Sequence, residues 1–354
     1  MDGLAESLGR SPELFPYLLD VGKDTLSLIR LTQSDYQKAS FLDGRIVTPR
    51  TIGRTLPWRQ VAASIEAAKL AERCGFIFHI GHVGSTLVSR LLGAHRGVFA
   101  VREPQVLRLF AQFLSEPQIQ ERVWSDGDFE QRLGGCLKLL SRTFEADQIA
   151  IVKATSFVSE LAATLLAGPS QPRALMMFAS AESYIATILG GPNSRQEAKA
   201  LTPSRLRRLN RRVGREAWRL ASLGEGEALA LGWACEMSAL AEAAHAAGDR
   251  VFRLDFDSFL DDPNPHLTAA FRHFDINPTD REVEAILDGP DMQRYSKAPE
   301  HPYDAALRRS VLDEARALHS TEIARGLAWL DKAAAEFAPV RDAMAFAETS
   351  SPLR

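Results

Sequence analysis

The stretch FIFHIGHVGSTLVSRLL, residues 76–92, constrains the fold of this chain more than any other part of the sequence. It predicts a buried strand, then a tight turn of small residues, then a helix with leucines at helical spacing. Such a turn directs backbone N–H groups and the positive end of the helix dipole at one place. Gly81 and Gly84 allow an anion to approach the backbone closely, and Ser85 and Thr86 add hydroxyl donors. The sequence therefore predicts a loop that binds phosphate or a similar anion.

The alternation of strand and helix continues along the chain. After the strand at 76–81, short apolar runs predict four more strands, at 97–101, 148–152, 173–179 and 249–256. Helices are predicted from Pro57 to near Gly75, at 203–222 and at 226–247. Strands that alternate with helices form parallel βαβ units with right-handed crossovers. We expect an α/β fold of the P-loop type, with a parallel sheet of about five strands, helices on both faces, helical insertions and a helical C-terminal portion.

Composition narrows the class of protein. The chain has 354 residues with a net charge of −3, and 45% of the residues are hydrophobic, so nothing indicates a nucleic-acid partner. No run of about 20 apolar residues predicts a membrane span. Three widely spaced cysteines are typical of a reduced cytosolic protein, and the acidic, polar N-terminus does not read as a secretory signal peptide, so we expect a cytoplasmic location. We divide the chain into a mixed N-terminal segment (1–57), a P-loop core (58–280) and a helical C-terminal extension packed on the core (281–354).

The loop departs from the signature of nucleoside-triphosphate-binding proteins. The pattern G-x-x-x-x-G-K-[ST] reads HIGHVGST here, with His79 at the first glycine and Ser85 at the lysine. Because the lysine that contacts the β- and γ-phosphates is missing, an ordinary ATPase or GTPase is disfavoured. A plain turn capped by Ser85, without any ligand, also fits the glycine spacing.

Several segments in order resemble the sulfotransferase superfamily: GHVGSTLVSRLL, VFAVREPQVLRLF, IAIVKATSFVSELAATLL and RVFRLDFDSFLDDPNPHLTAAFRHFDI. The resemblance covers about residues 76–280 and implies a P-loop relative that binds 3′-phosphoadenosine 5′-phosphosulfate as the donor. It implies that the donor is bound by the loop residues Gly81, His82, Val83, Gly84, Ser85, Thr86 and Leu87. His82 stands where the family usually has Lys or Arg, so a group that titrates near neutrality replaces a fixed cation.

One departure from the family concerns the 3′-phosphate of the donor. The family binds this phosphate with an Arg at the end of the fourth strand and a Ser in the next helix. Here Ala179 holds the first position, and Thr187 keeps only a hydroxyl at the second. Either the donor is different, or another cation compensates, for which the candidates are Lys297, Arg308 and Arg309.

The resemblance also implies three catalytic residues. Glu103 follows the second strand, where some branches of the family have a glutamate base that accepts the proton of the acceptor. His82 would stabilise charge on the bridging oxygen, and Lys153, at the end of the third strand, would contact the transferred group or a phosphate. The alternatives are a helix cap for Glu103 and plain exposure for Lys153. Arg102 either orients the Glu103 carboxylate or faces solvent.

Two other functions stay open at this stage. A nucleotide-dependent phosphotransferase with a degenerate loop would need a carboxylate for magnesium near a strand end, and Asp255 or Asp257 could serve. A non-catalytic anion- or nucleotide-binding scaffold fits the missing loop cation and Ala179. Sulfuryl transfer itself requires no metal, so no metal site is expected.

The acceptor is not encoded in a motif. We expect a hydroxyl or amine group on a small molecule, a carbohydrate or a peptide, and the sequence does not predict an oligomeric state. A basic helix with Arg208, Arg212, Arg215 and Arg219 on one face is either a lid over an anionic ligand or a solvated charged surface.

Overall fold

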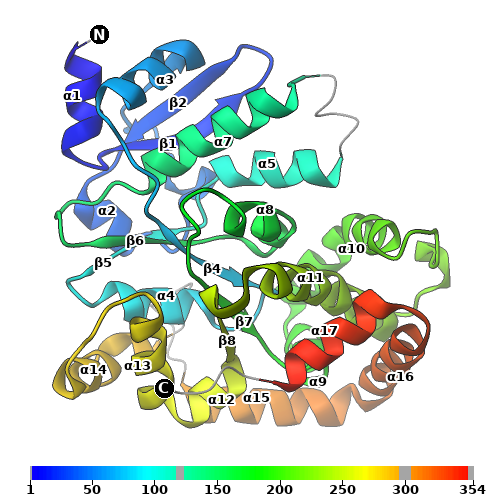
Figure 1. The fold of residues 1–354 in the computed structure, drawn as a ribbon. Helices are drawn as coiled ribbons and strands as arrows, with labels where there is room; N and C mark the ends of the chain where they lie inside the picture. Colours follow the sequence, from blue (N-terminus) through cyan, green and yellow to red (C-terminus); the bar gives the residue numbers. More distant parts are fainter. Residues whose placement is uncertain (1, 117–122, 295–303, 350–354) are drawn as a thin grey trace.

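The computed structural model describes residues 2–116, 123–294 and 304–349. Within these residues the centre of the fold is a five-stranded sheet in the order β5-β6-β4-β7-β8, in which every neighbouring pair is parallel (Figure 1). The strands are β4 (Gly75–His79), β5 (Val98–Arg102), β6 (Ile149–Lys153), β7 (Ala174–Phe178) and β8 (Val251–Asp255). All five residues of β4 and of β7 are buried, as expected for strands covered on both faces. The predicted fold class is confirmed.

The chain winds over this sheet in two directions. From β4 it passes through α4 (Ser85–Gly93) to β5 at one edge, and from β5 it returns through β6 and β7 to β8. Because parallel crossovers are right-handed, α4 lies on one face and the helices of the return path lie on the other. The loop after β4 therefore lies at the point where the winding reverses, which is where open α/β sheets bind ligands.

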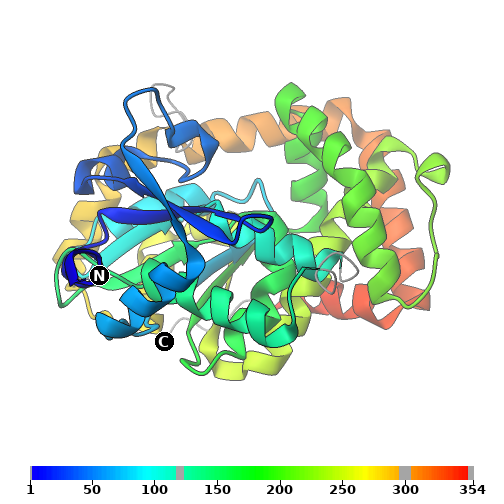
Figure 2. The same ribbon diagram turned by 90° about the horizontal axis from the view of Figure 1, so that it is seen from above.

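The return path contains helices of unequal length. They are α5 (Val106–Ser115), α7 (Asp126–Leu140), η2 (Ser156–Leu161), α8 (Ala162–Leu166), α9 (Ala181–Leu189), α10 (Pro192–Arg212), η3 (Leu220–Ser222), α11 (Glu225–Ala247) and η4 (Gly248–Arg250). After β8 come α12 (Phe256–Asp261), α13 (Pro263–His273), α14 (Asp280–Leu287), η5 (Pro290–Gln293), α15 (Ala305–Leu318), α16 (Ser320–Glu336) and α17 (Ala338–Glu348). Helix α11 packs against α10, α16 and α17, and these four gather beside one edge of the sheet (Figure 2). The described part of the C-terminal portion is mostly helical, as predicted.

The N-terminal segment forms a second, antiparallel sheet. It consists of β1 (Leu14–Asp20), β2 (Thr25–Arg30) and β3 (Gly53–Pro57), accompanied by α1 (Asp2–Arg10), α2 (Gln33–Lys38), η1 (Gly44–Ile46) and α3 (Trp58–Ala67). Strand β1 packs against α5 and α7. Its buried side chains belong to the same hydrophobic core as those of the parallel sheet. The three-part domain division stays a prediction.

Two predicted helices end elsewhere than the sequence suggested. Helix α3 ends at Ala67, well before Gly75, and Gly75 begins β4 instead of capping a helix. A Cβ at Gly75 would lie 2.6 Å from the Phe274 ring, so this glycine permits close packing. The helix predicted at 203–222 spans Pro192–Arg212, because a proline at its first turn starts it and Gly214, at φ 77°, follows its end.

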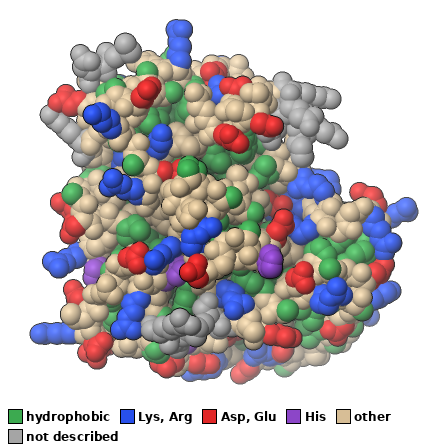
Figure 3. Space-filling view, viewed as in Figure 1, with side chains coloured by type: hydrophobic (Ala, Val, Ile, Leu, Met, Phe, Trp, Pro, Cys, Tyr) green, Lys and Arg blue, Asp and Glu red, His purple; other side chains and the backbone are tan. Residues whose placement is uncertain are grey.

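The surface carries both signs of charge. In Figure 3, Lys and Arg side chains alternate with Asp and Glu over the visible face. No helix in the described ranges is long and apolar enough to cross a membrane.

Candidate functional site

The loop between β4 and α4 has the backbone that its glycines predict. The φ angles of Gly81, His82 and Gly84 are 87°, 56° and 61°, and only glycine adopts such values without strain. Gly84 is the N-cap of α4 and offers no side-chain acceptor to the first turn. The N–H groups at the start of this helix are therefore available to an anion.

Gly84 is also required by a neighbour that the sequence did not reveal. A Cβ at Gly84 would lie 2.0 Å from the ring of Phe256, the first residue of α12. The contact fixes the loop against a segment far away in the sequence. A larger residue at this position would therefore collide with the protein itself before it filled the space of a ligand.

The hydroxyls of the loop are buried. Ser85 is 5% and Thr86 1% exposed. Thr86 Oγ1 has no hydrogen-bond partner among the residues that the structure describes. Because buried hydroxyls are nearly always bonded, Thr86 is a candidate donor to a ligand at the helix start.

A cavity of about 200 Å³ opens at the loop. Residues 82–87 line it, together with Thr187 from α9, Phe256 from α12 and Arg308 from α15. The sequence placed all but Phe256 of these at the site. The Thr187 hydroxyl donates to the Ser183 carbonyl at 2.6 Å, so its oxygen keeps acceptor capacity towards the cavity.

Of the three cations proposed to replace the missing arginine, Arg308 lies at the loop cavity. It is 4% exposed, its Nη2 lies 2.8 Å from Asp257 Oδ1, and its guanidinium lies 4.8 Å from the centre of the Phe256 ring. Arg309 does not line this cavity; its side chain is 61% exposed and pairs with Asp261 at 3.7 Å. Lys297 lies outside the described residues. Ala179, which stands where the family has an arginine, is buried, and its carbonyl accepts the Trp233 indole N–H.

His82 lies at the rim of the cavity. Its Nε2 is 3.6 Å from Glu197 Oε2 on α10, a contact that becomes an ion pair when the imidazole is protonated. The His82 side chain is 14% exposed and that of Glu197 is 61% exposed. The basic position of the loop thus faces a carboxylate near solvent.

The structure brings Glu103 and Lys153 together. They lie at the carboxyl ends of the neighbouring strands β5 and β6, and Lys153 Nζ donates to Glu103 Oε1. Lys153 is fully buried and Glu103 is 8% exposed. Glu103 has a φ of 53°, a strained value for a residue with a side chain. Backbone strain combined with a buried ion pair is a feature of functional sites.

Three alternatives for this region are wrong. Glu103 does not cap a helix, because α5 starts at Val106 and has no acidic residue in its first turn. Lys153 is not an exposed strand end. Arg102 neither faces solvent nor orients the carboxylate; it is buried and donates to the carbonyls of Tyr36 and Ala39 at the end of α2. Burial lowers the pKa of Arg102 to about 10.

Arg102 fastens part of the N-terminal segment beside the Glu103–Lys153 pair. The backbone N–H of Leu42 donates to the Arg102 carbonyl at 2.7 Å. Next to Leu42, the Phe41 ring lies 5.9 Å from Lys153 Nζ, and the Arg45 guanidinium stacks on the same ring at 3.4 Å. Burial lowers the pKa of Arg45. The hydrogen bonds that Arg45 donates to the Asp43 carboxylate, and the charges of Asp43, Glu103 and Glu197, outweigh burial, and the net shift of this pKa is upward. The N-terminal segment therefore forms one wall of the site.

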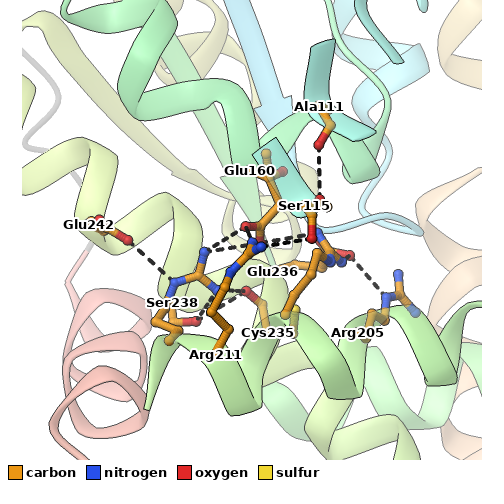
Figure 4. A network of polar contacts seen from close by, with 12 residues as sticks. Ala111, Ser115, Glu160, Arg205, Arg211, Cys235, Glu236, Ser238 and Glu242 are labelled. Carbon is orange, nitrogen blue, oxygen red and sulfur yellow. Dashed lines mark hydrogen bonds and ion pairs between the residues drawn. The ribbon is translucent and has the colours of Figure 1, made fainter. Parts of the chain in front are cut away.

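Arg208 and Arg212 of the basic helix form neither a lid nor a solvated face, whereas Arg215 is exposed and pairs with Glu336. Arg208 donates to Glu236 at 2.6 Å and to Glu160 at 3.2 Å. Figure 4 shows the network, in which Arg205 donates to Glu236 at 3.0 Å. Arg212 donates to both oxygens of Glu160 at 3.0 Å. These groups are mostly buried and join α10, α11 and η2. Arg215 and Arg219 lie beyond the end of α10.

The carboxylates considered for magnesium are engaged elsewhere. Asp255 accepts the N–H of Ser258 and caps α12, and burial raises its pKa. Asp257 pairs with Arg308. No group of three or more His, Cys, Asp and Glu side chains suited to a metal occurs in the described part of the chain.

No family model matches this chain, and no curated protein matches it. Among solved structures it is similar to a sulfotransferase domain from the curacin biosynthetic pathway, with 14% identity over 74% of this chain and 99% of that chain and a TM-score of 0.42. It is also similar to the sulfotransferase STF9 from Mycobacterium avium, with 13% identity over 90% of this chain and 96% of that chain and a TM-score of 0.37. Both identities and both TM-scores are low, so neither likeness carries an argument about what this chain does.

Proposed function

We propose that this chain transfers a sulfuryl group from 3′-phosphoadenosine 5′-phosphosulfate to a hydroxyl or amine acceptor. The observation that carries the proposal is the joint placement of an anion-binding loop and a buried carboxylate–lysine pair at the carboxyl ends of adjacent strands. Lys153 ends β6, which pairs with β4 through Ile77, just before the loop. A donor bound at the loop would thus have an acid–base group beside its transferred end.

Each group has a definite task in this reaction. The N–H groups of the loop, with Ser85 and Thr86, hold the 5′-phosphosulfate, and His82 stabilises the bridging oxygen as it gains charge. The acceptor oxygen or nitrogen attacks sulfur and passes its proton to Glu103, while the bond from sulfur to the bridging oxygen breaks. Adenosine 3′,5′-bisphosphate and the sulfated acceptor are the products. Lys153 holds the Glu103 carboxylate in position.

Arg308, together with Thr187, takes the 3′-phosphate in this proposal. Arg308 reaches the loop cavity from α15, whereas relatives are expected to have this cation at position 179. The guanidinium is already fixed by Asp257 and Phe256, so little side-chain entropy is lost on binding. The cavity of about 200 Å³ is smaller than the usual ~300–1,000 Å³ of ligand sites, so we expect α15 to shift outward when a whole nucleotide binds.

Calorimetric titration with adenosine 3′,5′-bisphosphate, ATP and GTP tests the proposal. We expect the bisphosphate to bind most tightly. Arg308→Gln should weaken its binding roughly 10- to 100-fold, the value of a hydrogen bond to a charged group, while binding of adenosine 5′-monophosphate stays the same. Arg309→Gln is the matched control on the exposed side of the same helix and should change neither.

The other two functions give different results in the same experiment. Preference for ATP or GTP would favour the phosphotransferase. Tight binding of the bisphosphate, without transfer of the sulfuryl group from the donor to water or to the hydroxyl and amine compounds tested, would favour the scaffold.

A further inference from the structure

Thr155 has a buried hydroxyl that the fold does not use. It is the N-cap of η2, but its side chain makes no cap hydrogen bond. The residue is 9% exposed, and Oγ1 has no partner in the described ranges. A threonine at an N-cap normally accepts a hydrogen bond from a backbone N–H, so the Thr155 hydroxyl is unusual in having no partner among the described residues.

The position of Thr155 links the two halves of the site. Two residues before it, Lys153 ends β6 and pairs with Glu103. The residue between them, Ala154, donates its N–H to the Ile77 carbonyl at 3.0 Å, which aligns this segment with the end of β4. The next residue, Ser156, has its Oγ 3.6 Å from where a Cβ on Gly81 would lie. Thr155 therefore lies in the short segment of chain that connects the carboxylate–lysine pair, through Lys153, to the first glycine of the loop, through Ser156.

In the proposed reaction, the sulfuryl group occupies the space between the loop and Glu103. It lies between the 5′-phosphate at the loop and the acceptor at Glu103. Its oxygens are hydrogen-bond acceptors, and a threonine hydroxyl is a neutral donor that rotates to suit them. A neutral donor can hold the group without pairing with the Glu103 carboxylate.

We propose that Thr155 Oγ1 donates a hydrogen bond to an oxygen of the transferred sulfuryl group. The inference rests on the proposed function and adds a contact that neither the glycine pattern nor the family resemblance assigned. Thr86 Oγ1, which also has no partner in the described residues, lies at the start of α4, where the proposed function assigns it to the 5′-phosphosulfate.

Two ligands that differ by one group isolate this contact. Adenosine 3′,5′-bisphosphate lacks the sulfuryl group, and 3′-phosphoadenosine 5′-phosphosulfate carries it. Thr155→Val should weaken binding of the phosphosulfate roughly 10- to 100-fold, as expected for a hydrogen bond to a charged group, and leave binding of the bisphosphate unchanged. Thr155→Ser keeps the hydroxyl and should retain both affinities.

Thr25→Val is the matched control. Thr25 Oγ1 is also buried without a partner in the described residues, but it belongs to β2 of the antiparallel sheet. The same loss of a hydroxyl there should change neither affinity. Both valine variants should melt at the same temperature as the wild type or higher, because they remove an unpaired polar atom.

The possible outcomes separate the two proposals. If the wild type binds the bisphosphate and the phosphosulfate and Thr155→Val changes their affinities equally or not at all, the Thr155 contact is overturned and the proposed function stands. If the wild type binds neither ligand, both proposals are overturned. Selective loss of the phosphosulfate in Thr155→Val, but not in Thr25→Val, is the expected result.

Discussion

The two clusters of buried charge in this fold are built differently. Around Glu236 and Glu160, three arginines donate several hydrogen bonds, and every member lies in regular helix or in η2. At the carboxyl ends of β5 and β6, Lys153 is the one residue that donates a hydrogen bond to Glu103 among the described residues. The backbone of Glu103 has a left-handed conformation. The first arrangement satisfies its carboxylates and braces helices. The second keeps a carboxylate in a strained conformation, which the fold sustains only where other contacts compensate.

The largest effect is expected from Glu103→Gln. If the pair is the acid–base centre, transfer of the sulfuryl group should slow roughly 10²–10⁴-fold, because the amide cannot accept the proton. Affinity for adenosine 3′,5′-bisphosphate should not change. Release of sulfate from radiolabelled donor measures transfer to water and requires no known acceptor. If the folded variant kept the wild-type rate, the Glu103–Lys153 pair would have a structural role, like the arginine network around Glu236 and Glu160.

Glu236→Gln tests the bracing role of the network. The substitution leaves Arg205 and Arg208 buried without their full counter-charge, and such a loss costs about 3–5 kcal/mol. Urea denaturation at neutral pH measures it. Glu336→Gln is the control, because the exposed Arg215–Glu336 pair should contribute less than about 1 kcal/mol. Equal midpoints for the two variants would show that the buried network does not stabilise the fold.

The same network predicts acid sensitivity. Burial alone would raise the pKa of Glu236, but Arg208 and Arg205 outweigh it and lower the pKa below the usual 4.5. A carboxyl whose pKa is lowered on folding stabilises the protein above its unfolded pKa, and this stability is lost as the pH falls through the folded value. The wild type should therefore lose stability below about pH 4.5, and Glu236→Gln should lose less over that interval.

The smallest effect should come from His82→Lys. If the His82 imidazole must be protonated to stabilise the bridging oxygen, the rate should fall as the pH rises and the imidazole loses its proton. A lysine stays charged there, so His82→Lys should keep activity and lose that limb of the profile. Rates at saturating donor between pH 5.5 and 8.5, in wild type and variant, provide the measurement. If His82→Lys shows the same fall in rate with rising pH as the wild type, a group other than His82 causes that fall.

Local sequence patterns were sufficient for the sheet and for the loop. The strand-turn-helix at 76–92 and the later apolar runs carry their signals within a few residues, so a parallel sheet could be predicted from strands that alternate with helices. The order of the strands was not predicted. Glu103 and Lys153 were each predicted at a strand end, and parallel strands bring such ends to one edge. Their direct pairing was not predicted, because the sequence does not show that β5 and β6 are neighbours in the sheet.

Contacts between distant segments were beyond such patterns. Phe256 against Gly84 and Arg102 on the carbonyls of α2 depend on packing between parts of the chain far apart in sequence. Arg208 appeared to lie on a charged helix face, because Glu160 and Glu236, which bury it, belong to other elements. A signal for the antiparallel sheet was present in the VGKD turn between β1 and β2, where Asp24 has a φ of 48°.

The order of strands in the sheet has a consequence for synthesis of the chain. β4 lies between β6 and β7, yet it is made before both of them, and each of its five residues is buried in the finished sheet. At a translation rate of about 5–20 residues per second, the strand emerges from the ribosome seconds before its neighbours exist. During that interval its apolar side chains and its unpaired backbone N–H and C=O groups are open to other nascent chains. Cells that make this protein should therefore depend on chaperones that cover β4, with the sequence GFIFH, until β7 has been translated.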